Sequence, residues 1–396
     1  MQASTKGGSF ADAVEILAEQ AEIEIEVKRL WRAVKRIGDE RWEEEEAAAQ
    51  AYEKLPLPAQ QQSPVDQVPQ VVSVQMDGGR LQTRDRKETP GDQDEGSTYW
   101  TEVKAGVLTT LHSEVHACDP CPELPPTFKD PGKMREIAKA IKGFTSPEKP
   151  PEQEEKEPDD EPQKEEPDRE GERPGKPQPL VKSVVAMVGP SEQFGRRLAS
   201  AAYARGFPAA QRKAFVSDGS ETNWSVHRRH FSEYTPIVDF VHALMYVYAA
   251  AMAGRGASEG WAVFSQWAQW LWGGQVDLVI AALTERRAEL GVPESNETGT
   301  PRAQVAESLR YLTNQRVRMN YAEYRKQGLP ITSTYIESTI KQINRRMKGT
   351  EKFWDTGVNA MLTLVGDQLT QTNIIARFWR RRTARLASQH FYQQAT

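Results

Sequence analysis

Two aspartates, Asp77 and Asp218, stand in the same local pattern, directly after an apolar run and directly before a glycine. Val71, Val72 and Val74 lead into the first, in "VVSVQMDGG", and "KAFVSDGS" contains the second. β-Branched runs of this kind predict strands, and the Asp-Gly step predicts that each strand ends there. Asp-Gly has two interpretations: a tight hairpin turn, or a carboxylate presented at a strand end to hold a metal ion.

The second interpretation makes a chemical prediction. Sites in open α/β sheets form where strands end, and two carboxylates brought together there repel each other unless a cation neutralises them. Ligation by oxygen alone favours Mg²⁺ or Mn²⁺. A glycine after each aspartate allows a metal, a phosphate or backbone to approach closely.

Glu337, in "TSTYIESTIKQINRRMKG", is the candidate for a third acid. At 3.6 residues per turn, Lys341, Arg345 and Lys348 fall on the same helical face. A carboxylate followed by a row of cations suits a metal bound beside a polyphosphate backbone. The alternative is a capping box that begins at Thr334, in which Glu337 only starts the helix.

The elements that must position these acids alternate between strand and helix. Apolar runs too continuous for simple alternation indicate a mixed or parallel α/β sheet. Strands are expected in 71–77, 98–111, 180–189, 213–218 and 235–240. Helices are expected in 191–207, 335–346 and 357–385, in a buried segment ending at 254, and throughout the tryptophan-rich stretch 255–327.

The N-terminal residues 9–53 are also expected to be helical, with a helix stop at Gly38. Two short helices joined near residues 22–24 could form a helix-turn-helix, with "VKRLWRAVKR" as the recognition helix. The alternative is a helical hairpin or coiled arm used for packing or dimerisation.

Charge is distributed unevenly along the chain, whose net charge of -5 is the sum of opposed segments. Residues 148–176 carry thirteen acidic and six basic side chains, and residues 341–396 carry ten basic and three acidic ones. The first segment lies in a Pro-rich stretch, 145–179, that is expected to be disordered. The second is a basic region suited to a polyanion.

The remaining bulk features exclude some classes of protein. Two cysteines, Cys118 and Cys121, give no disulfide framework, which favours a reducing cytoplasm. No basic and apolar leader opens the chain. The apolar stretch 237–254 is long enough to span a bilayer, but it contains Asp239 and His242 and is interpreted as a strand end followed by a buried helix.

The order of five motifs resembles the DDE transposases of bacterial insertion sequences, especially the Mutator-like group. The motifs are "VQMDGGRLQTR", "AFVSDGS", "IVDFVHAL", "GLPITSTYIEST" and "RRMKGTEKFW", and the resemblance spans roughly 70–112 and 180–365. It implies a ribonuclease-H-like mixed sheet flanked by helices, with an all-helical insertion between the second Asp and the Glu. It also implies a nucleoid-associated protein of the bacterial cytoplasm.

The resemblance assigns roles to individual residues. Asp77, Asp218 and Glu337 are implied to be the catalytic and metal-binding triad, which holds two Mg²⁺ or Mn²⁺ ions. Asp239 and His242 match a family motif of Cys or Asp, two residues, then His, which implies an accessory role. Without the resemblance, His242 is interpreted as a hydrogen-bonded histidine of the core.

The expected organisation follows from these assignments, with an N-terminal helical region, a linker, a catalytic domain split by the acidic spacer, and a basic C-terminal part. The boundaries are 1–53 for the helical region, 54–69 for the linker, 70–144 and 180–254 for the catalytic domain, 145–179 for the spacer, 255–330 for the insertion and 331–396 for the C-terminal part.

The expected function is a transposase that cuts and rejoins double-stranded DNA at its element's terminal repeats and in target DNA, as a homodimer on DNA. The alternatives are an inactive DNA-binding remnant, a ribonuclease-H-like nuclease without strand transfer, and a purely structural helical protein. The residues expected to contact DNA are Lys341, Arg345, Arg346, Lys348 and Trp354.

Three further patterns have open interpretations. His112, His116, Cys118 and Cys121 could bind zinc or lie in an ordinary exposed loop. Trp261, Trp267, Trp270 and Trp272 are expected in the core of the insertion, although a tryptophan can also stack on a flipped base. The arginine-rich run from 377 to 385 could contact phosphates or form a solvated face.

Overall fold

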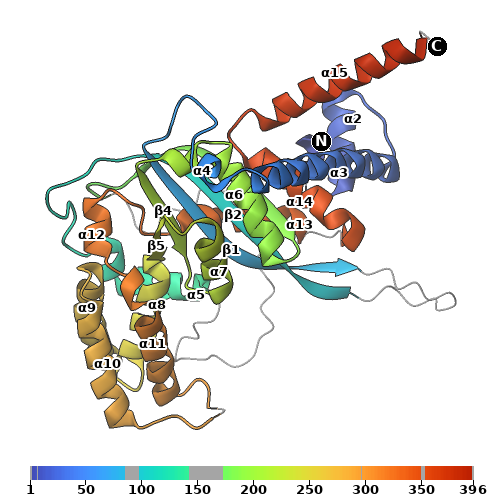
Figure 1. Cartoon of the computed structure of the whole chain (residues 1–396). Coiled ribbons are helices and arrows are strands. Elements are labelled where there is room, and N and C mark those ends of the chain that lie inside the picture. The colour runs from blue at the N-terminus through green and yellow to red at the C-terminus, as the bar shows by residue number, and fades with distance from the viewer. Residues whose placement is uncertain are drawn as a thin grey trace.

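A mixed β-sheet with helices on both faces forms the centre of the computed structural model, which describes residues 2–6, 8–84, 98–141, 173–295, 297–348 and 353–394 (Figure 1). The strand order is β3-β2-β1-β4-β5, and the short β6 pairs with β1. The strands are β1 (Val71–Arg84), β2 (Thr98–His112), β3 (Gln178–Val188), β4 (Arg212–Ser217), β5 (Thr235–Val238) and β6 (Phe353–Trp354). The expected α/β class with a mixed sheet is therefore confirmed.

The direction of the strands brings three aspartates to one edge. β1, β2 and β3 pair antiparallel, whereas β4 runs parallel to both β1 and β5. The last pair between β1 and β4 is Met76 with Ser217, and Ser217 also pairs with Val238 of β5. The next residue of each strand is Asp77, Asp218 or Asp239, so the three follow one another across the sheet edge.

The prediction that the first strand ends at Asp77 is wrong. β1 continues through the two glycines to Arg84, and Gly78 and Gly79 pair with Lys104 and Val103 of β2. Neither glycine has a positive φ, so both keep the extended conformation. The hairpin turn at Asp77 is thereby excluded, because the long partner strand β2 supplies backbone hydrogen bonds well past the break that the sequence suggested.

Two apolar clusters lie on opposite faces of the sheet. Along β3, Val185 and Met187 belong to one cluster, and Val184 and Ala186 belong to the other. The period of two is that of a strand buried on both faces. Helix α6 (Ser191–Tyr203) joins the first cluster, and helix α14 (Asp355–Leu369) joins the second. The site edge is thus built on a rigid, doubly covered sheet.

The N-terminal helices pack against this body. They are α1 (Gln2–Lys6), α2 (Phe10–Ala21), α3 (Val27–Glu53) and α4 (Leu57–Gln60). The predicted stop at Gly38 is wrong, since α3 passes through it without a break. A Cβ at Gly38 would lie 2.5 Å from the backbone oxygen of Ala360, so the glycine permits close packing of α3 on α14.

The predicted helical insertion is present after β5, and the part of it that the structure describes contains no strand. It lies to one side of the sheet (Figure 1). The apolar segment before it is the buried helix α8, as expected. These helices are α8 (Phe240–Met252), α9 (Ala257–Trp272), α10 (Val276–Leu290), α11 (Pro301–Gln315), η3 (Arg316–Arg318) and α12 (Tyr321–Lys326).

The remaining helices complete the fold. The single helix expected over 357–385 is divided into α14 and α15, with a break at residues 370–373. The others are η1 (Pro126–Lys129), α5 (Pro131–Ala140), η2 (Phe207–Ala209), α7 (Glu221–His230), α13 (Thr334–Met347) and α15 (Ile374–Gln394). Most of the acidic spacer lies outside the described residues. No described helix has the length and apolar character required to cross a bilayer.

Candidate functional site: an acidic cavity at the strand ends

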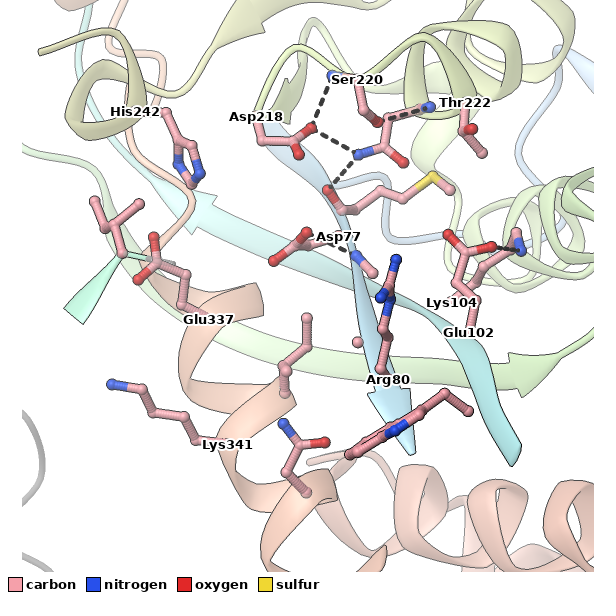
Figure 2. Close-up of a pocket in the computed structure, with 18 of the residues that line it drawn as sticks. Asp77, Arg80, Glu102, Lys104, Asp218, Ser220, Thr222, His242, Glu337 and Lys341 are labelled. Atoms are coloured by element: carbon pink, nitrogen blue, oxygen red, sulfur yellow. Dashed lines mark hydrogen bonds and ion pairs between the residues drawn. The ribbon is translucent and has the colours of Figure 1, made fainter. Parts of the chain in front are cut away.

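An open cavity of about 840 Å³ lies at the edge of the sheet where β1 and β4 present their aspartates. Side chains from β1, β2, α7, α8 and α13 line it, and Asp77, Asp218, His242 and Glu337 face it from different elements (Figure 2). Asp77 and Asp218 are 141 positions apart in the chain (218 minus 77). The parallel pairing of β1 and β4 brings them onto neighbouring strands.

Asp218 is held in place by its own turn. Its Oδ1 accepts hydrogen bonds from the backbone N–H of Ser220 (2.9 Å), the hydroxyl of Ser217 (3.1 Å) and the side-chain amide of Asn223 (3.0 Å). The Asn223 amide also donates to the backbone oxygen of Met76 on β1 (3.2 Å). Asn223 therefore links the middle of β1 to the end of β4, a role that the sequence did not indicate.

The helical insertion also holds this turn. The Tyr311 hydroxyl donates to the backbone oxygen of Asp218 (2.6 Å), and the Gln315 amide donates to that of Gly219 (2.9 Å). Gly219 has a φ of 99°, which favours glycine, and a Cβ there would lie 3.0 Å from the Tyr311 ring. The insertion is therefore part of the support of the acidic site.

Among the described residues, Asp239, His242 and Glu337 form a close group of potential metal ligands. Their ligand atoms lie within 4.8 Å of one another, so the group could bind a metal ion. Asp239 is 1% exposed and caps α8 by accepting from the backbone N–H of His242 (2.7 Å). It also accepts from the N–H of Ser333, which holds the segment before α13 against β5. Asp77 and Asp218 face the same cavity but are not in this group.

Glu337 does not belong to a capping box. The N-cap of α13 is Ser333, which makes no side-chain cap, and Glu337 lies in the first turn after it. Its carboxylate instead lies beside His242 on the cavity wall (Figure 2). The interpretation of Glu337 as only a helix starter is therefore wrong.

Asp77 is an acid of raised pKa. Burial is the main cause, the charge of Asp218 adds to it, and Glu337 contributes less, whereas the N–H of Gly78 and the charge of His242 oppose it. The result is a pKa of about 7 for the Asp77 carboxyl. Like charges crowded in a partly dry site are relieved by a cation, so this donor set fits a divalent metal ion.

His242 lies at the cavity wall with 23% of its side chain exposed, and it is not a core histidine. Its Nδ1 is 3.5 Å from Oδ1 of Asp239. Burial alone would lower the pKa of His242, but the contact with Asp239, and less so the charges of Asp218 and Glu337, raise it to about 9. Without a metal the ring is therefore an imidazolium facing the carboxylates.

Gln75, which is fully buried two residues before Asp77, ties β1 to the segment that carries Glu337. Its amide donates to the backbone oxygen of Thr332 (3.2 Å), and its Oε1 accepts from the N–H of Ile336 (3.1 Å). The Ile336 N–H also donates to the backbone oxygen of Ser333 (3.0 Å), so Gln75 supplies a second acceptor in the first turn of α13, where Ser333 makes no side-chain cap. One side chain therefore fixes the Glu337 helix relative to the Asp77 strand.

Replacing Gln75 with leucine is expected to lower the free energy of unfolding by about 2 kcal/mol, because it removes two buried hydrogen bonds that join β1 to the segment of Glu337. Urea denaturation of the metal-free protein measures this change. Gln82→Leu, on the same strand, is the control and is expected to change the free energy by less than about 0.5 kcal/mol. Equal effects of the two variants would contradict the role of Gln75.

The basic residues predicted to contact DNA lie in different environments. Lys341 lines the cavity from the Glu337 helix, and Lys348 lines it from the residue that follows that helix. Arg345 is exposed on α13 and does not line the cavity. The prediction for Arg346 is wrong: it is 3% exposed, donates to the backbone oxygen of Ser4 (2.6 Å) and covers the ring of Phe10. The side chain of Trp354 lies outside the described part of the structure.

The arginine-rich run on α15 is partly neutralised by the N-terminal helix. Arg382 and Arg385 pair with Glu40 of α3, and Arg381 pairs with Glu44. Arg377 and Arg380 are exposed. The run is therefore not a single phosphate-binding row, because three of its arginines join α15 to α3.

The N-terminal helices α2 and α3 are joined at residues 22–26, close to the predicted position. Leu30, Val34 and Ile37 of α3 are buried in the core. The opposite side of the helix exposes four cations, Lys28, Arg29, Arg32 and Arg36. These exposed cations are compatible with DNA recognition by this helix, which stays a prediction.

The histidine- and cysteine-rich segment does not form a metal-binding group in the described residues, in which the only such group is at the acidic cavity. It is a strap between the sheet and the insertion. Asp119 forms an ion pair with Arg325 of the insertion. The Trp272 indole donates to the backbone oxygen of Cys121 (2.8 Å), and the backbone N–H of His116 donates to the backbone oxygen of Lys326 (2.8 Å). The four tryptophans of the insertion pack in or against the core, as expected.

Comparison with known proteins finds no matching family model and no matching curated protein. The geometry of the cavity and the motifs in the sequence therefore carry the assignment of function.

Proposed function

We propose that this chain is a DDE-type transposase, which cuts DNA and joins the cut end to a new site with the help of divalent metal ions. The observation that carries the proposal is the meeting of Asp77, Asp218 and Glu337 at one cavity. The first aspartate is on β1, the second follows β4, and the glutamate is on the first turn of a helix after a helical insertion. This is the arrangement implied by the ribonuclease-H-like resemblance.

Asp77, Asp218 and Glu337 would hold two Mg²⁺ or Mn²⁺ ions, and Asp239 would offer a further carboxylate beside Glu337. When bound, such ions supply Lewis acidity for in-line displacement at a phosphodiester. The four carboxylates, with His242 as the one imidazolium among them, leave a surplus of negative charge when all are ionised. This surplus supports binding of cations and disfavours binding of DNA without them.

The other residues of the cavity have roles that follow from their charge and position. Lys341 and Lys348 would orient the DNA backbone, since both line the cavity on the Glu337 side. The protonated His242 ring would donate a hydrogen bond to a phosphate oxygen near the carboxylates. The cavity is open along the sheet edge, which gives a polymer access that a closed pocket would not.

The test is incubation of the protein with labelled duplex that carries the DNA flanking its own gene, with Mg²⁺, Mn²⁺ or EDTA. Metal-dependent nicking at a fixed position, followed by joining of the new 3′ end to a second duplex, is the expected result. Nicking without joining would favour the nuclease, and binding without nicking would favour the inactive DNA-binding remnant.

Metal affinity is expected to depend on pH through Asp77. Its pKa is about 7 in the folded, metal-free protein, so a proton competes with the metal below that pH. Between pH 8 and pH 6 the apparent dissociation constant for Mn²⁺ should rise about tenfold. Titration calorimetry at both pH values measures it, and Asp77→Asn should bind more weakly and lose this part of the pH dependence.

The same group makes an independent prediction for stability. Because the folded-state pKa of Asp77 is above its ordinary value of 3.8, the folded chain holds this proton more tightly than the unfolded chain does. The protonated carboxyl therefore contributes stability at low pH, and this contribution is lost as pH rises through about 7. Without metal at pH 8, Asp77→Asn should be more stable than the wild type by up to about 4 kcal/mol, because folding raises the pKa from 3.8 to about 7.

A further inference from the structure

Residues 173–176, with the sequence Arg-Pro-Gly-Lys, form a tight turn just before β3. Proline in the second position and glycine in the third are typical of a turn whose third residue has a positive φ. Gly175 has a φ of 70°, and the backbone N–H of Lys176 donates to the backbone oxygen of Arg173 (3.3 Å). The first and last Cα atoms of such a turn lie within about 7 Å of each other, so the turn brings an arginine and a lysine together.

The turn is packed against the strap that joins the sheet to the insertion. A Cβ at Gly175 would lie 2.5 Å from the side chain of Pro120 and 3.0 Å from Nε2 of His116, so this contact requires glycine. The guanidinium of Arg173 lies 5.8 Å from the centre of the Trp272 ring, and the arginine is 8% exposed. Tertiary packing therefore fixes where the turn places its cations.

Both cations of the turn line a small cavity of about 30 Å³, which is separate from the acidic cavity. The segment that leads into the Glu337 helix contributes three hydroxyl groups to the lining, from Thr332, Thr334 and Tyr335. Two prolines complete it, and no acidic residue in the described part of the chain lines it. The lining is therefore rich in hydrogen-bond donors and positive in charge.

The surroundings of the cavity favour an anion further. Thr334 and Tyr335 are the first two residues of α13, so the positive end of the helix dipole lies at the cavity. Burial lowers the pKa of the Lys176 ammonium to about 8, because it removes water that would stabilise the charge. An anion in the cavity would stabilise the charged form of this lysine.

We propose that this cavity binds one phosphate group, free or as a monoester, and that the bound group steadies the segment that carries Glu337. A guanidinium, an ammonium and hydroxyl groups are the donors that phosphate oxygens accept from. The volume has room for about two water-sized groups, which suits one small oxyanion and excludes a base or a sugar. This inference does not rest on the proposed function, since it involves neither a metal ion nor DNA.

The cavity adjoins hydrogen bonds that fix the start of α13. The backbone oxygen of Thr332 accepts from the Gln75 amide (3.2 Å), and the N–H of Ser333 donates to Asp239. The Thr334 hydroxyl donates to that of Thr332 (3.2 Å). A phosphate group held by these hydroxyls and by the turn would connect the start of α13 to the strap, and local opening of this segment would become rarer.

The test is titration calorimetry of the metal-free protein with inorganic phosphate, at pH 7 in EDTA. EDTA keeps metal ions out of the acidic cavity, whose carboxylates then disfavour phosphate there. Wild type should bind phosphate, and Lys176→Met should weaken binding by about 10- to 100-fold, as expected for loss of one charge-assisted hydrogen bond. Methionine replaces the desolvated ammonium with an apolar group of similar length, so the variant should remain folded.

Two further variants test whether the cavity itself is the site. Lys182→Met is the matched control, because Lys182 of β3 is also partly buried and its pKa is also lowered by burial, but it does not line the cavity. It should bind phosphate like the wild type. Thr334→Val removes one hydroxyl and should weaken binding by about 2- to 10-fold. Absence of binding by the wild type at millimolar phosphate, or equal affinities of the two lysine variants, would overturn the site.

Hydrogen exchange tests the effect on the Glu337 segment. Phosphate should slow amide exchange in residues 330–337 of the wild type and leave Lys176→Met unchanged. Unchanged exchange in a wild type that binds phosphate would overturn the steadying role.

A titration with adenosine monophosphate separates the two sources of the phosphate group. Binding that depends on Lys176 would support a monoester as the ligand, and binding of inorganic phosphate alone would support the free ion.

Discussion

Replacing Glu337 with glutamine is expected to lower the rate of metal-dependent DNA cleavage by about a thousandfold while DNA affinity stays within a factor of a few. The amide keeps the shape of the side chain and removes the charge that would help to hold a cation. Loss of ~4 kcal/mol of charge stabilisation corresponds to this factor. Cleavage of labelled duplex, with binding measured on the same preparation, checks both expectations.

Two observations make this variant informative. Glu337 is not the partner of an N-cap, so its replacement should not unfold the start of α13. Glu285→Gln, an exposed glutamate of the helical insertion, is the matched control and should cleave like the wild type. If Glu337→Gln cuts as fast as this control, Glu337 is not part of the reacting site and the proposed function fails.

Replacing Asp119 with alanine is expected to destabilise the protein by about 3 kcal/mol, because it leaves the guanidinium of Arg325 buried without its counter-ion. Arg325 is fully buried, and its Nε lies 2.9 Å from Oδ1 of Asp119. Its Nη2 also donates to the backbone oxygen of Trp272 (2.9 Å). The pair joins the strap after β2 to α9 and α12, so the insertion should loosen first.

Urea denaturation measures the loss of stability, and limited proteolysis should show earlier cleavage between 255 and 330 in the variant. The control is Asp277→Ala, since Asp277 pairs with Arg316 at the surface, where both side chains are about 60% exposed. Such a pair contributes at most about 1 kcal/mol. A loss in Asp119→Ala no larger than in this control would contradict the structural role of the strap.

Several elements of the fold could be predicted because their signals are local. The strands before Asp218 and Asp239 are apolar runs with clear ends. The helical stretch after residue 255 has a helical periodicity whose ends are equally clear. The end of β1 could not be predicted in this way. β1 continues through two glycines because it pairs with β2, and nothing in residues 71–84 indicates which strand they pair with.

The acids of the site could be proposed from the sequence, since an Asp-Gly after a strand is a local pattern and the motif order gave Glu337. Their supports could not. Gln75, Asn223 and Tyr311 are ordinary polar or aromatic residues until the fold places them beside the ends of α13 and β4. Arg346 shows the converse, because its charge suggested a DNA contact and its burial beneath α2 excludes one.

By itself, the sequence determined the classes of side chain available for chemistry and the strands and helices that carry them. The tertiary structure decided which of them meet. Parallel pairing of β1, β4 and β5 brings Asp77, Asp218 and Asp239 to one edge, and the fold determines which cations face solvent. The physical reason is that strand pairing and side-chain burial join residues more than a hundred positions apart, whereas periodicity and turn signals act over a few residues.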